Sequence, residues 1–193
     1  MKLLISSTGS SGSILTHTLV DYLLMRSDCP YDISLISTKT ANEISKTETG
    51  ADFASKYHQE NSGVKYYPDN SFYAPPASGS TFDYDALVVI PASMGFLSRC
   101  STGTSSTLSE RAFDVALKEG TKIVVVPREM PFSKVHLQTL LRLSDLGIIV
   151  CPACSSYYNS PVTAQDMTDN VVGKVLKLIG VDNNLYKKWS VNA

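Results

Sequence analysis

The sequence predicts an α/β fold in which helices cover both faces of a mainly parallel sheet. Short apolar runs of strand length alternate with longer segments of helical periodicity, and the runs are continuously apolar, as in parallel strands buried on both faces. Alternation of this kind is typical of β-α-β units, so we expect a three-layer α/β/α architecture. The predicted strands are Leu3–Ile5, Ile33–Ile36, Ala86–Ile90, Ile123–Val126 and Ile148–Cys151.

One predicted helix has recognisable ends. Ser133 is placed to cap its N-terminus, and Gly147 stands where a left-handed residue commonly follows the C-terminus. We expect this helix to bury Leu137, Leu140 and Leu141.

A capping-box pattern begins the last predicted helix. Thr163 is followed three residues later by Asp166, and the helix ends at Gly180. Its apolar stripe consists of Val171, Val172, Val175, Leu176 and Ile179.

The segment from Gly50 to Asp83 lacks periodicity and is rich in tyrosine and proline. We expect a long irregular loop there, and such loops in compact domains usually carry function or an oligomer contact. We also expect it to become ordered when a ligand binds.

Composition excludes several classes of protein. A chain of 193 residues is long enough for one domain with a buried core, taken here as residues 1–193. Seventeen Lys and Arg against eighteen Asp and Glu give a net charge of −1, which disfavours general binding to nucleic acid or to an anionic membrane. No signal peptide or membrane-spanning run is evident, and four cysteines are few for a disulfide framework, so we expect a soluble, cytoplasmic protein with reduced thiols.

The first predicted strand leads into a Gly/Ser turn, Thr8–Ser13, followed by the helical pattern Ile14–Leu24. Such a turn exposes backbone N–H groups to an anion and favours a phosphate site, with a tight turn that merely caps an ordinary helix as the alternative. The turn lacks the three glycines of a dinucleotide fingerprint and the Gly-Lys-Ser/Thr of a Walker loop, which disfavours NAD and ATP.

Polar residues follow three further predicted strands. Arg128 and Glu129 come after one strand, Ser93 after another, and Thr38 with Lys39 after a third. The carboxyl ends of parallel strands are where open α/β sheets bind ligands. An arginine there can hold a phosphate and a glutamate can move a proton, whereas a solvated Arg-Glu ion pair is the alternative.

The C-x-x-C pair, Cys151 and Cys154, is a weak signal for zinc or redox chemistry. It is a single pair, and none of the histidines His17, His58 and His136 lies near it in the sequence. We interpret the pair as structural thiols and expect no metal site. His136 lies within a predicted helix, where we expect it to pack or cap.

Several stretches spread over nearly the whole chain resemble the UbiX-type flavin prenyltransferases, within the larger group of FMN-containing Cys decarboxylase-like flavoproteins. The stretches are Thr8–Gly12, Thr47–Thr49, Ala74–Ser80, Pro91–Gly95, Glu110–Glu119 and Val126–Phe132, with the regions of Tyr158 and Trp189.

This resemblance implies a Rossmann-like, flavoprotein-type fold that binds FMN at a subunit interface of a homo-oligomer, a dodecamer. It implies transfer of a dimethylallyl group from dimethylallyl monophosphate to N5 and C6 of reduced FMN. The product, prenylated FMN, would serve a UbiD-type decarboxylase, as in ubiquinone biosynthesis. No metal is implied.

The resemblance also implies roles for individual residues. The implied FMN contacts are Gly9, Ser10, Ser11, Thr38, Ser93, Met94, Gly95, Phe96 and Arg128. The implied catalytic residues are Glu48 as acid/base, Ser11 as proton relay and Glu129 as the acid that protonates the leaving phosphate. The implied prenyl-phosphate contacts are Arg111, Lys118, Glu129, Tyr158 and Lys174.

The chain departs from the family pattern at a few positions. Lys174 stands where arginine is usual, so a two-pronged phosphate clamp becomes a flexible point charge. Phe96 stands where a threonine is usual beside the flavin, Ser106 and Thr107 replace an amide or acid pair, and Asn159 replaces a common histidine.

Two other functions are compatible with the sequence. One is an FMN-dependent decarboxylase of a small acid, although the segment Pro91–Phe96 matches only the first three residues of the motif of the cysteine decarboxylases, and His17 does not align with their helix histidine. The other is an FMN-binding carrier protein, which would bind flavin without any dependence on prenyl phosphate.

Overall fold

The computed structural model describes residues 1–26, 31–60, 62–158 and 160–186. Asn159 and Trp189, which entered the sequence analysis, lie outside the described residues, as does Cys29, one of the four cysteines. Within the part described, no helix is long and apolar enough to cross a bilayer.

A parallel sheet of six strands forms the centre of the described residues. The chain moves outward from β1 to β3 on one side and then returns to place β4 on the other side of β1. The carboxyl ends of β1 and β4 therefore form a topological switch point, where open α/β sheets bind ligands. In spatial order the strands are β3 (Val64–Pro68), β2 (Asp32–Ser37), β1 (Lys2–Ser7), β4 (Ala86–Ala92), β5 (Lys122–Pro127) and β6 (Ile149–Val150).

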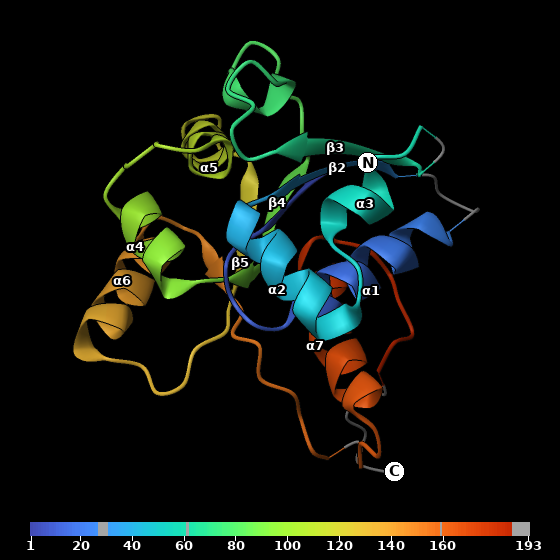
Figure 1. The fold of residues 1–193 in the computed structure, drawn as a ribbon. Helices are drawn as coiled ribbons and strands as arrows, with labels where there is room; N and C mark the ends of the chain where they lie inside the picture. The colour runs from blue at the N-terminus through green and yellow to red at the C-terminus, as the bar shows by residue number, and fades with distance from the viewer. Residues whose placement is uncertain (27–30, 61, 159, 187–193) are drawn as a thin grey trace.

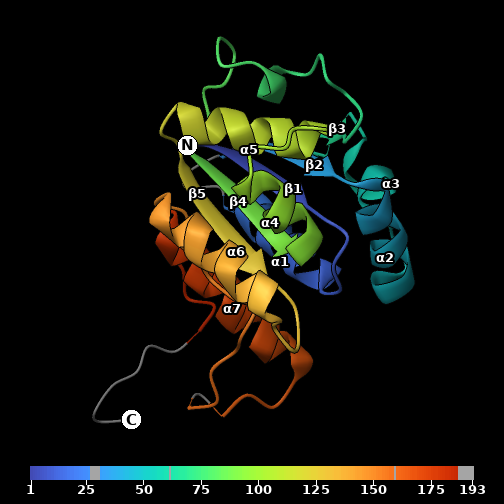
Figure 2. The same cartoon turned by 90° about the vertical axis from the view of Figure 1, so that its left-hand side faces the viewer.

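Helices cover both faces of the sheet, which confirms the three-layer prediction (Figures 1 and 2). One face carries α4 (Met94–Ser101), α5 (Leu108–Lys118) and α6 (Lys134–Asp145). The other carries α1 (Ser13–Leu24) and α7 (Ala164–Leu178), with α2 (Lys39–Thr49) and α3 (Phe53–Tyr57) beside α1.

The strands separate two apolar clusters because successive side chains point to opposite faces. Leu3 and Ile5 of β1 belong to the cluster under α1 and α7, whereas Leu4 between them belongs to the cluster under α4 and α5. Burial on both faces explains why these strands are continuously apolar.

The segment from Gly50 to Asp83 is more regular than the sequence predicted. It contains α3, β3 and a 3-10 turn, η1 (Pro75–Ala77). The pattern did not reveal β3 because this strand lies at the sheet edge, where Lys65 and Pro68 are exposed and no continuous apolar run is needed.

The helix predicted after Ser133 is present as α6, but its buried face was predicted only in part: Leu140 packs against the apolar cluster under α4 and α5, whereas the other two predicted leucines do not. Leu137 is 55% exposed and Leu141 is 63% exposed. The buried side chains are instead Thr139 and Leu143, which lie one turn apart on the face turned to the sheet. Helical periodicity located the helix but not its rotation, because α6 carries apolar residues on two faces.

The predicted helix ends are confirmed. Ser133 forms a capping box with His136, so this histidine has the capping role expected for it. Thr163 and Asp166 form the second box, at the start of α7. Gly147 and Gly180 follow the ends of α6 and α7 with positive φ angles of 82° and 86°.

His17 on α1 is buried among polar and aromatic side chains. Its ring stacks on Phe53 with 4.6 Å between centroids. Its Nε2 lies 2.8 Å from Ser45 Oγ and its Nδ1 lies 3.1 Å from the Tyr57 hydroxyl. Burial lowers the pKa of His17 to about 4, and the positive charge of Lys56 acts in the same direction. The neutral imidazole therefore serves as a core hydrogen-bonding group.

We expect His17 to make the protein less stable in mild acid. In the unfolded chain this histidine takes up a proton near pH 6.5, whereas in the folded protein it does so only near pH 4. Protonation therefore favours the unfolded state, and the free energy of unfolding decreases as the pH is lowered through that window. Urea unfolding should show a fall of about 2 kcal/mol between about pH 6.5 and about pH 5 from this group. The variant His17→Gln should lack this part of the fall, while His58→Gln, at an exposed histidine, should retain it. An unchanged pH dependence in His17→Gln would contradict the expectation.

Candidate functional site

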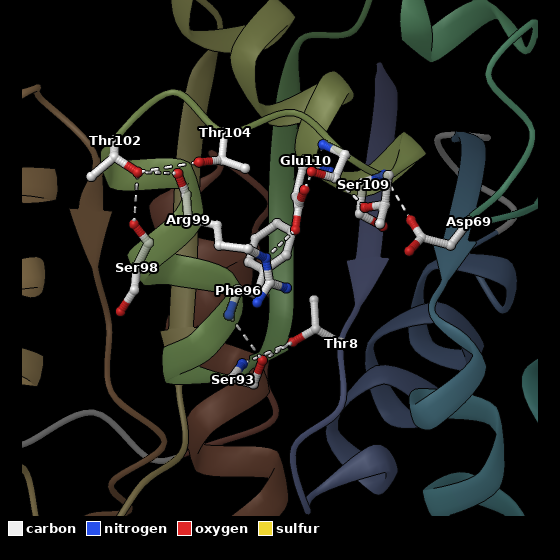
Figure 3. A network of polar contacts seen from close by, with 12 residues as sticks. Thr8, Asp69, Ser93, Phe96, Ser98, Arg99, Thr102, Thr104, Ser109 and Glu110 are labelled. Atoms are coloured by element: carbon white, nitrogen blue, oxygen red, sulfur yellow. Dashed lines mark hydrogen bonds and ion pairs between the residues drawn. The ribbon is translucent and has the colours of Figure 1, made fainter.

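Hydrogen bonds join the carboxyl ends of β1 and β4. The Thr8 N–H and hydroxyl both donate to the Pro91 carbonyl oxygen, at 3.3 and 3.1 Å. The Ser93 N–H donates to Thr8 Oγ1 at 2.8 Å. Ser93 also caps α4, where its Oγ accepts from the Phe96 N–H at 3.4 Å (Figure 3). The loops at the switch point are thus held together by backbone and hydroxyl groups.

A cavity of about 380 Å³ opens at this point and is called here the switch-point cavity. Two cationic side chains line it, Lys39 at the start of α2 and Arg99 on α4, together with the carboxylate of Asp69. Hydroxyl groups and cations are the donors that a phosphate group requires. The hydroxyl groups in the lining belong to Thr8, Thr38, Thr40, Ser93 and Thr107.

Four of the residues implied to bind FMN, namely Gly9, Thr38, Ser93 and Phe96, come together in this cavity. Thr38 caps α2, its Oγ1 accepting from the Ala41 N–H at 3.0 Å. Gly9 is needed for space, because a Cβ atom there would lie 2.8 Å from Cγ2 of Thr40. The turn after β1 therefore passes close to the start of α2.

The N-terminus of α1 is occupied by Glu48, from the end of α2. The Glu48 carboxylate accepts from the Gly12 N–H at 3.0 Å, the Ser13 N–H at 2.9 Å and the Ser13 hydroxyl at 2.7 Å. The sequence predicted these N–H groups as free donors for a phosphate, but a carboxylate of the same chain takes them. The alternative, a tight turn that caps a helix, describes this segment better, with the cap supplied by another helix.

Glu48 is held in its charged form. Burial by itself would raise the pKa of this carboxyl, but hydrogen bonds from the Ser11 and Ser13 side chains and from the backbone N–H groups of Ser13 and Gly12 outweigh it, so the pKa lies below its usual value. An ionised carboxylate accepts a proton but has none to donate. Its hydrogen bond with Ser11 brings together two of the residues implied to be catalytic.

The loop after β5 is bonded to the same turn. Ser10 Oγ donates to the Arg128 carbonyl oxygen at 2.9 Å, and Arg128 Nε donates to the Ser11 carbonyl oxygen at 3.1 Å. Glu129 Oε1 accepts from the Met130 N–H at 3.1 Å. Arg128 and Glu129 therefore have different partners, in contrast to the solvated ion pair that the sequence left open.

Two further cavities adjoin one another beside this loop. Arg128 lines the first, of about 500 Å³, called here the Arg128 cavity. Tyr158 and Lys174 line the second, of about 270 Å³, called here the Tyr158 cavity. The tertiary structure thus brings two of the residues implied to bind prenyl phosphate close to Arg128. The two cavities share Cys154, Ser155 and Val171 in their linings.

The start of α4 offers a ligand its backbone more than its side chains. Met94 is 3% exposed and Phe96 is 2% exposed, and Phe96 packs edge-to-face on Phe113. Gly95, between them, is exposed. Contacts from Met94 and Gly95 to a ligand would therefore come from their backbone N–H groups, whereas the Phe96 N–H already donates to Ser93 Oγ.

Arg111 and Lys118 do not approach Lys174 within one chain. Arg111 Nη1 pairs with Asp114 at 2.8 Å, and Lys118 Nζ pairs with Glu119 at 2.9 Å. Both cations belong to α5, on the opposite face of the sheet from α7, which carries Lys174 (Figure 2).

The two cysteines of the C-x-x-C pair have different surroundings. Burial raises the pKa of Cys151, which supports a structural thiol. Cys154 is exposed and lines both the Arg128 cavity and the Tyr158 cavity. Among the residues that the structure describes, no three His, Cys, Asp or Glu side chains are grouped as a metal site.

The sequence analysis missed three residues of the switch-point cavity. Thr40 carried a usable signal, since it lies two residues beyond Thr38 at the same strand end. Asp69 follows β3, the strand that was not predicted. Arg99 lies in the second turn of α4, and only the packing of α4 against α5 turns it toward the cavity (Figure 3).

The fold and the site define an α/β protein with a hydroxyl-rich, cationic cavity at the switch point of a parallel sheet, the place where such sheets bind mononucleotides. The family profile described as Flavoprotein matches residues 1–180. The chain belongs to the flavoprotein family and, within it, to the UbiX flavin prenyltransferases.

The second part of that assignment rests on full-length similarity. A curated relative from Methanocaldococcus jannaschii, named flavin prenyltransferase UbiX, is 40% identical over 189 residues, 98% of each chain. A dodecameric FMN-dependent UbiX-like decarboxylase from Escherichia coli O157:H7 superposes with a TM-score of 0.90 at 33% identity, over 98% of this chain and all of that one. A UbiX protein in complex with FMN and dimethylallyl pyrophosphate superposes with a TM-score of 0.88 at 28% identity, over 98% and 97%.

The residues present fit FMN. The switch-point cavity supplies the hydroxyls and cations that a phosphate dianion needs, and Gly9 leaves the turn without a side chain where a Cβ would collide with Thr40. The Arg128 cavity adds a guanidinium next to the apolar side chains of Leu15 and Val171, a combination suited to an aromatic ring with polar edges.

We expect Glu48→Gln to lower stability at neutral pH and to matter little in acid. The charged carboxylate stabilises the N-terminus of α1, and because its pKa is lowered from 4.5, this contribution is complete above pH 4.5 and is lost as the pH falls through the lower folded value. Thermal melts should show that the variant unfolds with a free energy lower than that of the wild type by roughly 0.5 kcal/mol at about pH 7, and that this difference shrinks at about pH 3. Glu43→Gln, an exposed site on the same helix, is the control. A wild-type-to-variant difference of equal size at both pH values would contradict the expectation.

Proposed function

We propose that this chain is a flavin prenyltransferase that joins the dimethylallyl group of dimethylallyl monophosphate to N5 and C6 of reduced FMN. The observation that carries the proposal is that the implied residues line cavities: Gly9, Thr38 and Ser93 line the switch-point cavity, while Tyr158 and Lys174 line the cavity that adjoins the Arg128 cavity. The names of the full-length relatives and the complex of a UbiX protein with FMN and dimethylallyl pyrophosphate support it.

In this proposal the phosphate of FMN lies in the switch-point cavity, held by Thr38, Ser93 and the first N–H groups of α4. Gly9, Ser10 and Ser11 would hold the ring system, and Arg128 would contact its polar edge. The hydrogen bond from Ser10 to the Arg128 carbonyl and that from Arg128 to Ser11 support the proposal, because they fix the loop and the turn relative to each other.

Reduced FMN, when bound, supplies the nucleophilic N5 and C6 atoms. Joining the prenyl group to N5 and C6 releases one proton from each of these atoms, of which one is taken up by the prenyl carbon beside the new bond to C6, where the double bond is lost, and the other by the leaving phosphate. We assign acceptance of the proton that leaves C6 to Glu48, with Ser11 as relay. Two observations support the assignment: the pKa of Glu48 is lowered, which keeps it in the accepting form, and Ser11 is hydrogen-bonded to it.

Breaking the allylic C–O bond sends the electron pair to the phosphate, so cations and a proton donor must stabilise the leaving group. We assign the cation to Lys174, the hydroxyl contact to Tyr158 and the proton to Glu129. The joint lining of one cavity by Tyr158 and Lys174 supports the first two roles.

We assign Arg111 and Lys118 to a prenyl-phosphate site that they would form together with a second copy of the chain. They lie on the other face of the sheet from Lys174, so they would complete a prenyl-phosphate site only at a subunit interface. An exposed apolar stripe on and before α6, with Met130, Leu137 and Leu141 at 88%, 55% and 63% exposure, supports a homo-oligomer. We propose a dodecamer, the assembly named for the Escherichia coli O157:H7 relative.

Three further points stay predictions: delivery of the product to a UbiD-type decarboxylase, a role in ubiquinone biosynthesis and a cytoplasmic location.

The decarboxylase alternative is not favoured. Two FMN-dependent cysteine decarboxylases superpose with TM-scores of 0.57 and 0.60 at 15% and 16% identity, which shows the fold alone. His17, the histidine of the first helix, is buried in the core next to Phe53, away from the switch-point cavity.

Anaerobic incubation of the protein with reduced FMN and dimethylallyl monophosphate should yield a flavin heavier by one five-carbon unit, detected by mass analysis of the extracted flavin. Glu48→Gln should still bind FMN but should accumulate no ring-closed product, because it cannot accept the proton. Glu43→Gln is the matched control. Unchanged flavin from wild-type protein that binds it tightly would point to the carrier function, and normal turnover by Glu48→Gln would refute the role given to that residue.

Lys174→Ala should raise the KM for dimethylallyl monophosphate by about ten-fold or more, because a charged contact to phosphate is lost, and should leave the Kd for FMN unchanged. Lys174→Arg should restore the KM, since it keeps the positive charge. Steady-state kinetics with Lys177→Ala, an exposed lysine one turn along α7, provides the control. Equal effects of the two alanine variants would argue against a specific role of Lys174.

A further inference from the structure

Arg99 on α4 is fixed in direction by a buried carboxylate. Its Nε donates to Oε1 of Glu110 at 2.5 Å. The Glu110 side chain is 0% exposed, and its Oε2 accepts from the Ser106 N–H at 2.7 Å. A buried carboxylate needs its charged partner, so Glu110 fixes the Nε end of the Arg99 guanidinium in place.

The remaining part of the guanidinium lies at the switch-point cavity. Arg99 lines this cavity together with Thr8 and Ser93, and Figure 3 shows the guanidinium between Glu110 on one side and the Thr8–Ser93 pair on the other. In the hydrogen bonds found between described residues, the Arg99 side chain uses Nε alone. Both Nη groups therefore keep their N–H donors for a ligand.

Gly95 lies beside the Arg99 guanidinium. A Cβ atom at Gly95 would lie 3.6 Å from Arg99 Nη1, so the guanidinium folds back over the first turn of α4. A longer side chain at position 95 would occupy the space that the guanidinium uses. Gly95 and Arg99 are one turn apart, as expected for residues whose side chains share a helix face.

Phe96 also lines the cavity, but its side chain has no hydrogen-bond donor. Its ring is buried and packs edge-to-face on Phe113, with 6.0 Å between centroids. Of the two α4 residues that line this cavity, Phe96 and Arg99, only Arg99 carries side-chain N–H donors.

We infer that Arg99 binds the phosphate of FMN through its Nη groups. The inference rests on the proposed function, because it needs FMN in the switch-point cavity. A guanidinium offers parallel N–H donors that match two phosphate oxygens and keeps its charge at any physiological pH. The one carboxylate in the lining, Asp69, is turned toward α5, where its Oδ1 accepts from the Ser109 N–H at 2.8 Å (Figure 3).

The competing interpretation is a purely structural ion pair that joins α4 to α5. Riboflavin separates the two interpretations, because it carries the ring system of FMN without the phosphate. Arg99→Ala should raise the Kd for FMN by about ten-fold or more and leave the Kd for riboflavin unchanged, as measured by quenching of flavin fluorescence. Arg142→Ala, at an exposed arginine on α6, should change neither value.

Removing Arg99 alone leaves Glu110 as a buried, unpaired charge, so a second variant keeps the test decisive. The double variant Arg99→Ala/Glu110→Gln removes both charges, and its amide oxygen can still accept from the Ser106 N–H. The double variant should show the same selective loss of FMN affinity as Arg99→Ala. Glu110→Gln alone should keep most of the wild-type affinity for FMN, because Arg99 is still present.

An equal loss of FMN and riboflavin binding in both Arg99 variants, or no loss of FMN affinity, would overturn the role of Arg99 while leaving flavin binding intact. A wild-type protein that binds neither flavin would overturn the proposed function together with this inference.

Discussion

The parallel pairing of β1 with β4 is the constraint on which the site depends. It brings the residues after two strands that are far apart in the sequence to one point at the sheet edge, where Thr8 and Ser93 are hydrogen-bonded. The turn before α1, the start of α4 and the loop after β5 then all meet there. A change in the strand order would leave each of these segments intact and would separate their functional groups.

Two helix N-termini near this point have different partners. The N-terminus of α1 receives the Glu48 carboxylate from its own chain, so its donors are already used. The N-terminus of α4 has Arg99 and the hydroxyls of the switch-point cavity beside it. Each helix N-terminus stabilises an anion. The Glu48 carboxylate at α1 can therefore lie next to a site at α4 that is suited to the phosphate of a ligand.

One chain holds most of the proposed site but not all of it. Tyr158 and Lys174 lie near Arg128, whereas Arg111 and Lys118 lie on α5 on the other face of the sheet. The exposed leucines of α6 leave an apolar surface that a lone chain does not cover. Both observations fit an enzyme whose site is completed by neighbouring copies.

The sequence by itself determined the class of fold, the strands β1, β2, β4, β5 and β6, and the capped ends of α6 and α7, because continuous apolar runs and capping residues are local signals. It also placed Thr38, Ser93 and Arg128 at strand ends. It could not give the edge strand β3, which needs no apolar run, or the rotation of α6, whose apolar residues lie on two faces. Only the tertiary structure decided that Glu48 caps α1 and that Glu110 turns Arg99 to the cavity, because both depend on contacts between helices that no local pattern encodes.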